Sequence, residues 1–110
     1  MKKIFVILFF TLLTVLTYAI PSGDYYKVKR DGSKDYNRYV IVNNTRKSIT
    51  LVSNRDVVVD WDIVEEKYDG AQDATVIRVK SPYGVYKTIY SYKENGKTYL
   101  QIDNNVYVLS

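Results

Sequence analysis

Tyrosine is the residue type whose number and spacing in this sequence suggest a chemical role. The chain of 110 residues contains 12 Tyr. A tyrosine side chain joins an apolar ring to a polar hydroxyl, so exposed tyrosines suit the binding of proteins and saccharides. The same residues also favour β-strands and stabilise them through cross-strand pairs. The candidate ligand-binding residues lie close together near the C-terminus, and they are Tyr86, Tyr90, Tyr92, Tyr99 and Gln101.

Carboxylates are the second group of residues that could do chemistry. Residues 56–73 carry seven Asp and Glu against one Lys. Such oxygen ligands suit Ca²⁺, and the weak candidates for a metal site are Asp60, Asp62 and Glu65. The segment does not match an EF-hand loop, and a solvated acidic strand edge and turn that face basic neighbours explain it better. We therefore predict no metal site, and the pattern gives no support to a pair of glycosidase carboxylates.

The residue types that are missing narrow the function further. The chain has no Cys and no His. This excludes a disulfide framework, a thiolate zinc site, a Ser-His-Asp triad and a histidine general base. The sequence also lacks a phosphate-binding glycine loop and the common motifs of a serine nucleophile. We therefore predict a protein that is not an enzyme and that holds no cofactor.

Residues 1–19 have the layout of a secretory signal peptide. Two lysines precede a 13-residue apolar run at 4–16, and the small residue Ala19 follows at the position expected for cleavage. As a helix this run spans about 20 Å, which is short for a bilayer core of about 30 Å. We expect a cleavable signal peptide helix, cut after Ala19 or a few residues later near Ser22. An uncleaved N-terminal anchor is the alternative.

Removal of this segment changes the charge of the protein. The net charge falls from +4 to +2, because Lys2 and Lys3 are lost. A polyanion-binding protein needs a dense basic surface, so we expect no nucleic-acid partner, and no membrane contact once the signal is removed. The expected location is secreted and extracellular, or periplasmic in a Gram-negative bacterium.

The composition of the remaining 91 residues predicts the fold class. Residues 20–110 contain 13 Val, 11 Tyr and 7 Ile, but only 3 Leu and 2 Ala. β-branched and aromatic residues favour strands, and no window shows the helical spacing of apolar residues. We predict one all-β domain over 20–110, a small antiparallel β-sandwich or barrel of about seven to eight short strands in a mainly meander order.

Clusters of Asn, Asp, Gly, Ser and Pro recur at short intervals and mark the turns between strands. They divide the chain into eight segments with short connections. The expected strands are Tyr25–Arg30, Tyr36–Val42, Ser48–Ser53, Val57–Val64, Ala74–Lys80, Val85–Tyr92, Thr98–Ile102 and Val106–Leu109. The acidic segment Glu65–Asp73 is expected to be the turn after the fourth strand.

The fourth expected strand shows which of its faces is buried. Successive side chains of a strand point to opposite faces. The core face should carry the uncharged set that includes the single Trp of the chain, and the outer face should carry the two acids. The core set is Val57, Val59, Trp61 and Ile63, and the outer set is Val58, Asp60, Asp62 and Val64.

Asn95-Gly96 is the strongest hairpin signal in the sequence, because a type I′ turn needs positive φ at both residues. A two-residue loop there places Tyr92 opposite Tyr99, and Tyr90 opposite Gln101. One face of the hairpin is then apolar and the other is rich in tyrosine. The apolar face carries Ile89, Ser91, Leu100 and Ile102, and a further two-residue turn adds Tyr107 and Leu109 to it while Val106 and Val108 join the tyrosine face.

Three further features bear on partners. Asn43-Asn44-Thr45 is a glycosylation sequon, so Asn43 is a modification site if the host is a eukaryote. The last strand, Val106–Leu109, is expected to offer an unpaired edge for self-association. The turn Ser81–Gly84 suits the inserting loop of an inhibitor.

Together these patterns predict a small secreted, non-catalytic β-domain. Its expected role is that of a binding or interaction module for a protein or saccharide partner outside the cell, through the tyrosine-rich face of its sheet. A structural or self-assembling coat or matrix protein is one alternative. An inhibitor of a secreted hydrolase is the other.

Overall fold

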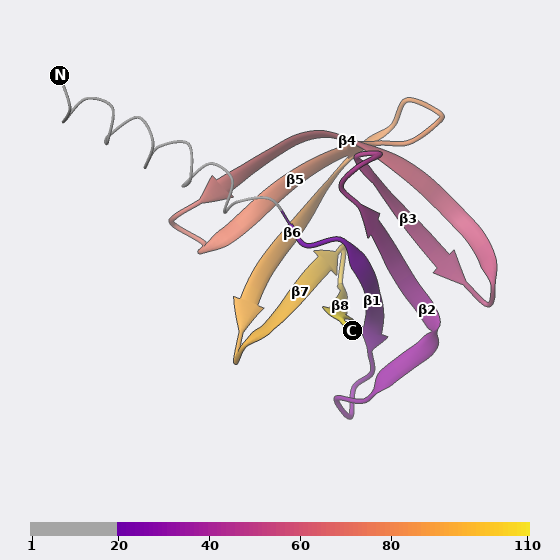
Figure 1. The fold of residues 1–110 in the computed structure, drawn as a ribbon, viewed down its shortest axis with the longest axis vertical. Helices are drawn as coiled ribbons and strands as arrows, with labels where there is room; N and C mark the ends of the chain where they lie inside the picture. Colours follow the sequence, from indigo (N-terminus) through magenta and orange to yellow (C-terminus); the bar gives the residue numbers. More distant parts are fainter. Residues whose placement is uncertain (1–19) are drawn as a thin grey trace, which may run out of the picture.

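The computed structural model describes residues 20–110, which form an all-β fold of eight antiparallel strands in one meander (Figure 1). Within these residues no helix is long and apolar enough to cross a membrane. The expected signal peptide at 1–19 lies outside the described residues. The strands are β1 (Gly23–Val28), β2 (Lys34–Asn43), β3 (Ser48–Ser53), β4 (Asp56–Asp69), β5 (Ala74–Lys80), β6 (Tyr86–Glu94), β7 (Lys97–Ile102) and β8 (Asn105–Leu109).

The positions that turn residues indicated for the strands are confirmed along most of the chain. β3 and β5 have the expected bounds, and the ends of the other strands apart from β4 lie within two residues of expectation. The agreement arises because Asn and Asp tolerate the left-handed backbone that tight turns need. Asn54, Asn95 and Asp103 all have φ between 50° and 55°.

β4 is longer than the sequence indicated. It continues to Asp69 instead of ending at Val64, and the turn is confined to residues 70–73. The expectation of a turn from Glu65 onwards is wrong. Acidic residues are disfavoured in strands, but here Glu65 to Asp69 all pair with β5, and Glu65 on the outer face stays exposed.

A bulge at the start of β4 reverses one predicted side chain. Val57 pairs with Val52 and Val59 pairs with Leu51, which leaves Val58 as an extra residue. A bulge of this kind switches the faces of the residues on either side of it. Val57 is therefore 63% exposed, and the expectation that it faces the core is wrong. Val59 packs against the core as expected.

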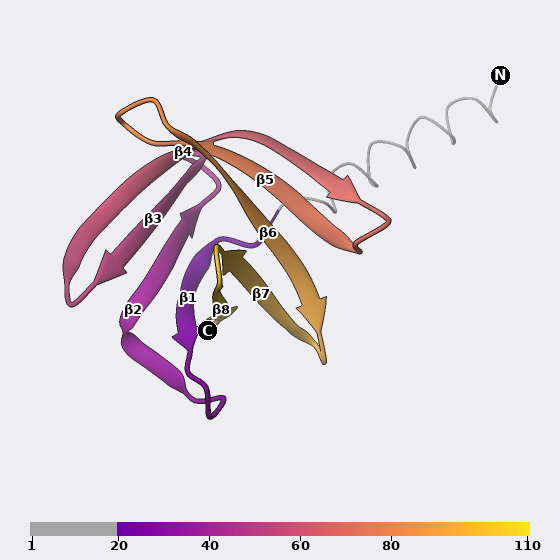
Figure 2. The ribbon, with the colours of Figure 1, turned by 180° about the vertical axis from the view of Figure 1, so that it is seen from behind.

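A second bulge bends β4 in its middle. Ile63 pairs with Val79 and Glu65 pairs with Arg78, so Val64 is the extra residue. Both ribbon views show the result: the first half of β4 runs beside β3, and after the bend the second half runs beside β5 (Figures 1 and 2). One strand thus joins two halves of the sheet that run in different directions.

The meander closes on itself, because β1 pairs with β8 as well as with β2. Tyr25, Tyr26 and Lys27 of β1 lie opposite Leu109, Val108 and Tyr107 of β8.

This pairing corrects the expectation that Val106–Leu109 is a free edge. Its backbone already has a neighbour on each side at Tyr107 and Val108. The twist of the sheet and the bend in β4 bring the first strand beside the last, which the sequence pattern could not reveal.

The hydrophobic core lies on the inner face of the closed sheet. Trp61 is buried as expected, and so is the apolar face of the β6–β7 hairpin with Tyr107 added to it. Every strand except β4 and β8 contributes to the set of largest fully buried side chains. The largest fully buried side chains are Tyr25, Ile49, Ile77, Ile89, Leu100, Val40, Val42 and Val79.

The β6–β7 hairpin has the predicted register. Asn95 and Gly96 have φ of 52° and 77°, as a type I′ turn requires. Tyr92 lies opposite Tyr99, and Tyr90 lies opposite Gln101. The tyrosine-rich face of this hairpin therefore exists as predicted, back to back with the buried face.

The core and the first bulge can be tested by one pair of truncations. Leu100→Ala should lower the free energy of unfolding by about 2–5 kcal/mol, because it leaves a cavity in a fully buried site. Val57→Ala should change it by no more than about 0.5 kcal/mol, because the side chain is exposed. Urea unfolding of both variants measures this difference. A large loss for Val57→Ala would contradict the bulge.

Candidate functional site

Two tyrosines of the β6–β7 hairpin form a stacked pair on the outer surface. The ring centroids of Tyr92 and Tyr99 are 5.4 Å apart with an interplanar angle of 15°. Tyr90 and Gln101 form the neighbouring cross-strand pair on the same face. The structure thus brings together four of the five residues that the sequence indicated.

Tyr86 is the fifth candidate, and it belongs to a different environment. Its ring lies beneath two cations, with the Arg78 guanidinium carbon 4.5 Å and the Lys80 ammonium 5.6 Å from the ring centroid. Along a strand it is four residues, or roughly 13 Å, from Tyr90. This distance and the two cations set Tyr86 apart from the stacked pair, so we leave it out of the site.

The tyrosine surface extends beyond the hairpin onto strands that are distant in sequence. Tyr99 lies opposite Val108, Val108 lies opposite Tyr26, and Tyr26 lies opposite Tyr39. Cross-strand partners share a face of the sheet, so these side chains form one row from β6 to β2. We call the row and its attached ring the tyrosine band, and its members are Tyr92, Tyr99, Val108, Tyr26, Tyr39 and Tyr36.

Ring contacts hold the second half of the tyrosine band together. The ring of Tyr26 is 5.7 Å from that of Tyr39 and 5.0 Å from that of Tyr36, which it meets edge-on. Tyr36 is 67% exposed, whereas Val108 between the two tyrosine groups is only 5% exposed. The sequence could not indicate this half, because its place beside the hairpin depends on the pairing of β1 with β8.

The surroundings of Tyr92 favour the neutral form of its hydroxyl. Partial burial raises the pKa of its hydroxyl, and Glu94 and Tyr99 raise that pKa further. A phenol with a raised pKa stays protonated at neutral pH. Tyr92 can therefore donate a hydrogen bond to an oxygen atom of a ligand.

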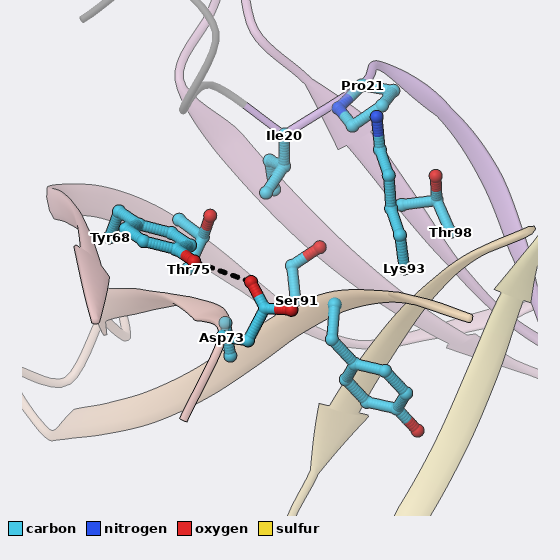
Figure 3. Close-up of a pocket in the computed structure, with 10 residues that line it drawn as sticks. Ile20, Pro21, Tyr68, Asp73, Thr75, Ser91, Lys93 and Thr98 are labelled. Carbon is cyan, nitrogen blue, oxygen red and sulfur yellow. Dashed lines mark hydrogen bonds between the residues drawn. The ribbon is translucent and has the colours of Figure 1, made fainter. Parts of the chain in front are cut away.

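A pocket of about 340 Å³ adjoins the tyrosine band. It lies between the β4–β5 turn, the ends of β6 and β7, and the chain before β1 (Figure 3). Tyr92 contributes to its lining and so links it to the stacked pair. The lining residues are Ile20, Pro21, Tyr68, Asp73, Ala74, Thr75, Ser91, Tyr92, Lys93 and Thr98.

The polar side chains of the pocket come from the inner face of the sheet. Tyr68 lies opposite Thr75, which lies opposite Ser91, and Ser91 is buried. The bulge at Val64 turns Tyr68 to this side, because without the extra residue it would share the outer face with Asp62. The sequence placed Ser91 on the inner face but did not indicate a pocket there.

Two charged side chains complete the pocket. The Tyr68 hydroxyl donates a hydrogen bond to Oδ1 of Asp73, and Lys93 lies across the pocket from this pair, with Ser91 between them in Figure 3. Within residues 20–110 the ion pairs are Arg46–Asp60 and Lys87–Asp103. Neither Asp73 nor Lys93 takes part in one.

The chain segment before β1 is fastened to the fold and forms the apolar wall of the pocket. Ile20 is 2% exposed, and its carbonyl oxygen accepts a hydrogen bond from the Asn44 side chain. The Asn44 N–H donates to the Ser22 hydroxyl at 2.9 Å, and the Tyr25 hydroxyl donates to the Pro21 carbonyl at 2.7 Å. Residues 20–22 are therefore part of the folded domain.

The acidic candidates for a metal site are not gathered. Within residues 20–110 no group of three acidic side chains is arranged to hold a metal ion. Asp60 accepts a hydrogen bond from the Thr50 hydroxyl at 2.7 Å and lies 3.9 Å from Arg46. Asp62 lies opposite Lys80, and Glu65 lies opposite Arg78. These carboxylates thus face hydroxyl and basic neighbours along β4.

Asn43 ends β2 at the turn that the sequence indicated. Its side-chain oxygen accepts hydrogen bonds from the backbone N–H groups of Thr45 and Arg46, both at 3.1 Å. The side chain therefore caps this turn through its oxygen atom. Modification of Asn43 in a eukaryotic host stays a prediction.

The turn Ser81–Gly84 is a hydrogen-bonded loop with an exposed tip. The Ser81 N–H donates to the Val85 carbonyl at 2.9 Å, and the Gly84 N–H donates to the Ser81 carbonyl at 3.0 Å. The Val85 N–H also donates to the Ser81 hydroxyl at 3.1 Å. Tyr83 at the tip is 92% exposed.

No protein-family model, curated protein or solved structure matches the chain. The interpretation of the site therefore rests on its own geometry.

Deletion of residues 20–22 tests their place in the fold. The free energy of unfolding of a chain that begins at Gly23 should be about 3 kcal/mol lower than that of one that begins at Ile20, because a buried isoleucine and three hydrogen bonds are lost. Chemical denaturation of the two chains measures the difference. Equal stability of the two chains would show that residues 20–22 do not stabilise the folded domain.

The dependence of stability on alkaline pH tests the buried tyrosines. Burial raises the pKa of Tyr25, and burial outweighs the opposing effect of Arg38 to raise that of Tyr107. The folded state then keeps protons that the unfolded state releases above about pH 10, so stability is full below that pH and falls as pH rises beyond it.

Tyr25→Phe should lower stability at neutral pH by about 1 kcal/mol, through loss of the bond to Pro21. It should also weaken the fall above about pH 10. Tyr83→Phe is the control, because it removes an exposed hydroxyl and leaves the buried ones. Urea unfolding across this pH range gives the slopes, and equal slopes for Tyr25→Phe and the parent chain would contradict the prediction.

Proposed function

We propose that this chain is an exported, non-catalytic binding module that holds an extended saccharide against the tyrosine band. The observation that carries the proposal is the row of four tyrosines over five neighbouring strands, from Tyr92 on β6 to Tyr39 on β2, with Val108 of β8 between Tyr99 and Tyr26. Strands are about 4.8 Å apart, so the row is roughly 19 Å long. That length suits a chain of sugar units better than a single ring.

The nature of the tyrosine band favours a saccharide over a protein. Aromatic rings offer apolar faces to the C–H faces of sugars, and phenol hydroxyls can bond to sugar hydroxyls. The centre of a protein interface is usually a desolvated apolar pocket. Val108, the aliphatic member of the band, is already covered, and the row continues past Tyr39 through Val52, which is also buried, before it reaches the exposed Val57 on β4.

The absence of catalysis and the exported location belong to the same proposal. The chain has no His and no Cys, and none of Asp60, Asp62, Glu65 and Glu66 lines the pocket. Export rests on the signal-like sequence of residues 1–19. We also propose that the closed strand order makes the domain a barrel rather than a sandwich, with the tyrosine band on its outside.

The loop Ser81–Gly84 supports a second candidate function. Its three hydrogen bonds hold the loop in one shape, and the exposed ring of Tyr83 stands at its tip. A preformed loop that presents an aromatic anchor suits insertion into the cleft of a secreted hydrolase, because little entropy is lost on binding. Tyr83→Ala would abolish inhibition of such an enzyme and leave saccharide binding unchanged.

The tyrosine band can be tested with a purified chain that begins at Ile20. We expect it to bind long oligosaccharides on a glycan array, or insoluble chitin, cellulose or peptidoglycan in a pull-down. Tyr99→Ala should lower the affinity for the saccharide about tenfold, because an aromatic contact of about 1.5 kcal/mol is lost. Tyr83→Ala, which removes an exposed tyrosine outside the band, is the matched control.

Two outcomes would overturn the proposal. One is the absence of binding to every saccharide probe. The other is an equal loss of binding in Tyr99→Ala and Tyr83→Ala. Capture of a defined protein through Tyr26, Tyr39 and Tyr99 would instead place a protein on the band and would also contradict it.

A further inference from the structure

The pocket and the tyrosine band lie on opposite faces of the sheet and share Tyr92, which stands just beyond the last pairing of β6 with β5 at Ser91. Tyr92 stacks on Tyr99 within the band and also lines the pocket. A chain that leaves the band at Tyr92 must therefore pass round this end of β5 to enter the pocket. The pocket volume of about 340 Å³ is at the small end of the range for ligand sites, which suits one terminal unit of such a chain.

The lining of the pocket has a mixed polarity. Hydroxyl groups come from Thr75, Ser91 and Thr98, and an apolar wall comes from Ile20 and Pro21. The inner face of a closed sheet is normally filled with apolar side chains, as the fully buried core of this domain is. The change to polar residues at this one end creates a set of hydrogen-bonding groups around an open volume.

The charges of the pocket favour a neutral ligand. Asp73 and Lys93 line it together, and within residues 20–110 neither is in an ion pair. A carboxylate accepts hydrogen bonds and an ammonium donates them. A ligand of either charge is attracted by one of these two side chains and repelled by the other. A hydroxyl group of a neutral ligand both donates and accepts hydrogen bonds, so it can bond to Asp73 and to Lys93.

We infer that this pocket binds the terminal, uncharged sugar unit of the saccharide held by the tyrosine band. The inference rests on the proposed function and names the chemistry of its end group. Asp73 and Lys93 hold hydroxyl groups from opposite sides, as their positions in Figure 3 allow. Ile20 and Pro21 cover the C–H face of the ring. The buried Ser91 lies between Asp73 and Lys93.

The test uses the chain that begins at Ile20 and two variants of the pocket. Asp73→Asn removes the charge but keeps an acceptor for Tyr68, and asparagine tolerates the left-handed backbone of Asp73, whose φ is 50°. Lys93→Met keeps the stem and removes the ammonium. Lys97→Met is the matched control, because this exposed lysine lies on the same hairpin outside the pocket.

The probes are glucose, galactose, N-acetylglucosamine and mannose, with glycine as a zwitterionic probe, followed by the longest saccharide that binds the band. Amide shifts in NMR titrations report where each probe binds. We expect one monosaccharide to shift Thr75, Ser91 and Thr98, and its affinity to fall at least fivefold in Asp73→Asn and Lys93→Met. Lys97→Met should bind it as the parent chain does.

The outcomes separate this inference from the proposed function. Tyr99→Ala should lower the affinity for the long saccharide and leave the affinity for the monosaccharide unchanged. If the long saccharide binds through Tyr99 but Asp73→Asn and Lys93→Met leave its affinity unchanged, the inference about the pocket is wrong and the proposed function stands. Binding of glycine in place of every sugar would also overturn the inference. Binding to neither band nor pocket would overturn both.

Discussion

The bulge at Val64 is the constraint on which the rest of this structure depends. One extra residue lets β4 turn through the middle of its length, so that its first half completes the ladder with β3 and its second half starts the ladder with β5. A sheet that bends in this way can curl until its first and last strands meet. The pairing of β1 with β8 follows, and no strand within residues 20–110 is left without two neighbours.

The same bulge sets what the interior contains. Before Val64, the inward residues of β4 are apolar and include Trp61. After it, Glu66 and Tyr68 fall on the inward side, opposite Ile77 and Thr75. Partial burial raises the pKa of Glu66, and the nearby Lys47 opposes that shift. The centre of the interior is therefore apolar, and the end of the interior where Tyr68 lies is polar.

The outer surface depends on closure rather than on any single strand. The two tyrosine groups come from segments more than fifty residues apart in sequence, and they meet because β8 lies between β7 and β1. Val108 is the point of contact, opposite Tyr99 on one side and Tyr26 on the other. Its low exposure shows how closely the two groups cover it. An open meander would hold the same tyrosines at opposite edges of the sheet.

The sequence by itself determined what depends on neighbours along the chain. Composition set the all-β class, turn residues set the strand positions, and Asn95-Gly96 set the register that stacks Tyr92 on Tyr99. These are local effects of backbone preference and of alternation. Only the tertiary structure decided the bulges at Val58 and Val64, because an extra residue leaves no mark in an alternating pattern rich in valine. The inward turn of Tyr68, the second half of the tyrosine band and the pocket all follow from pairing between distant strands, which no local pattern encodes.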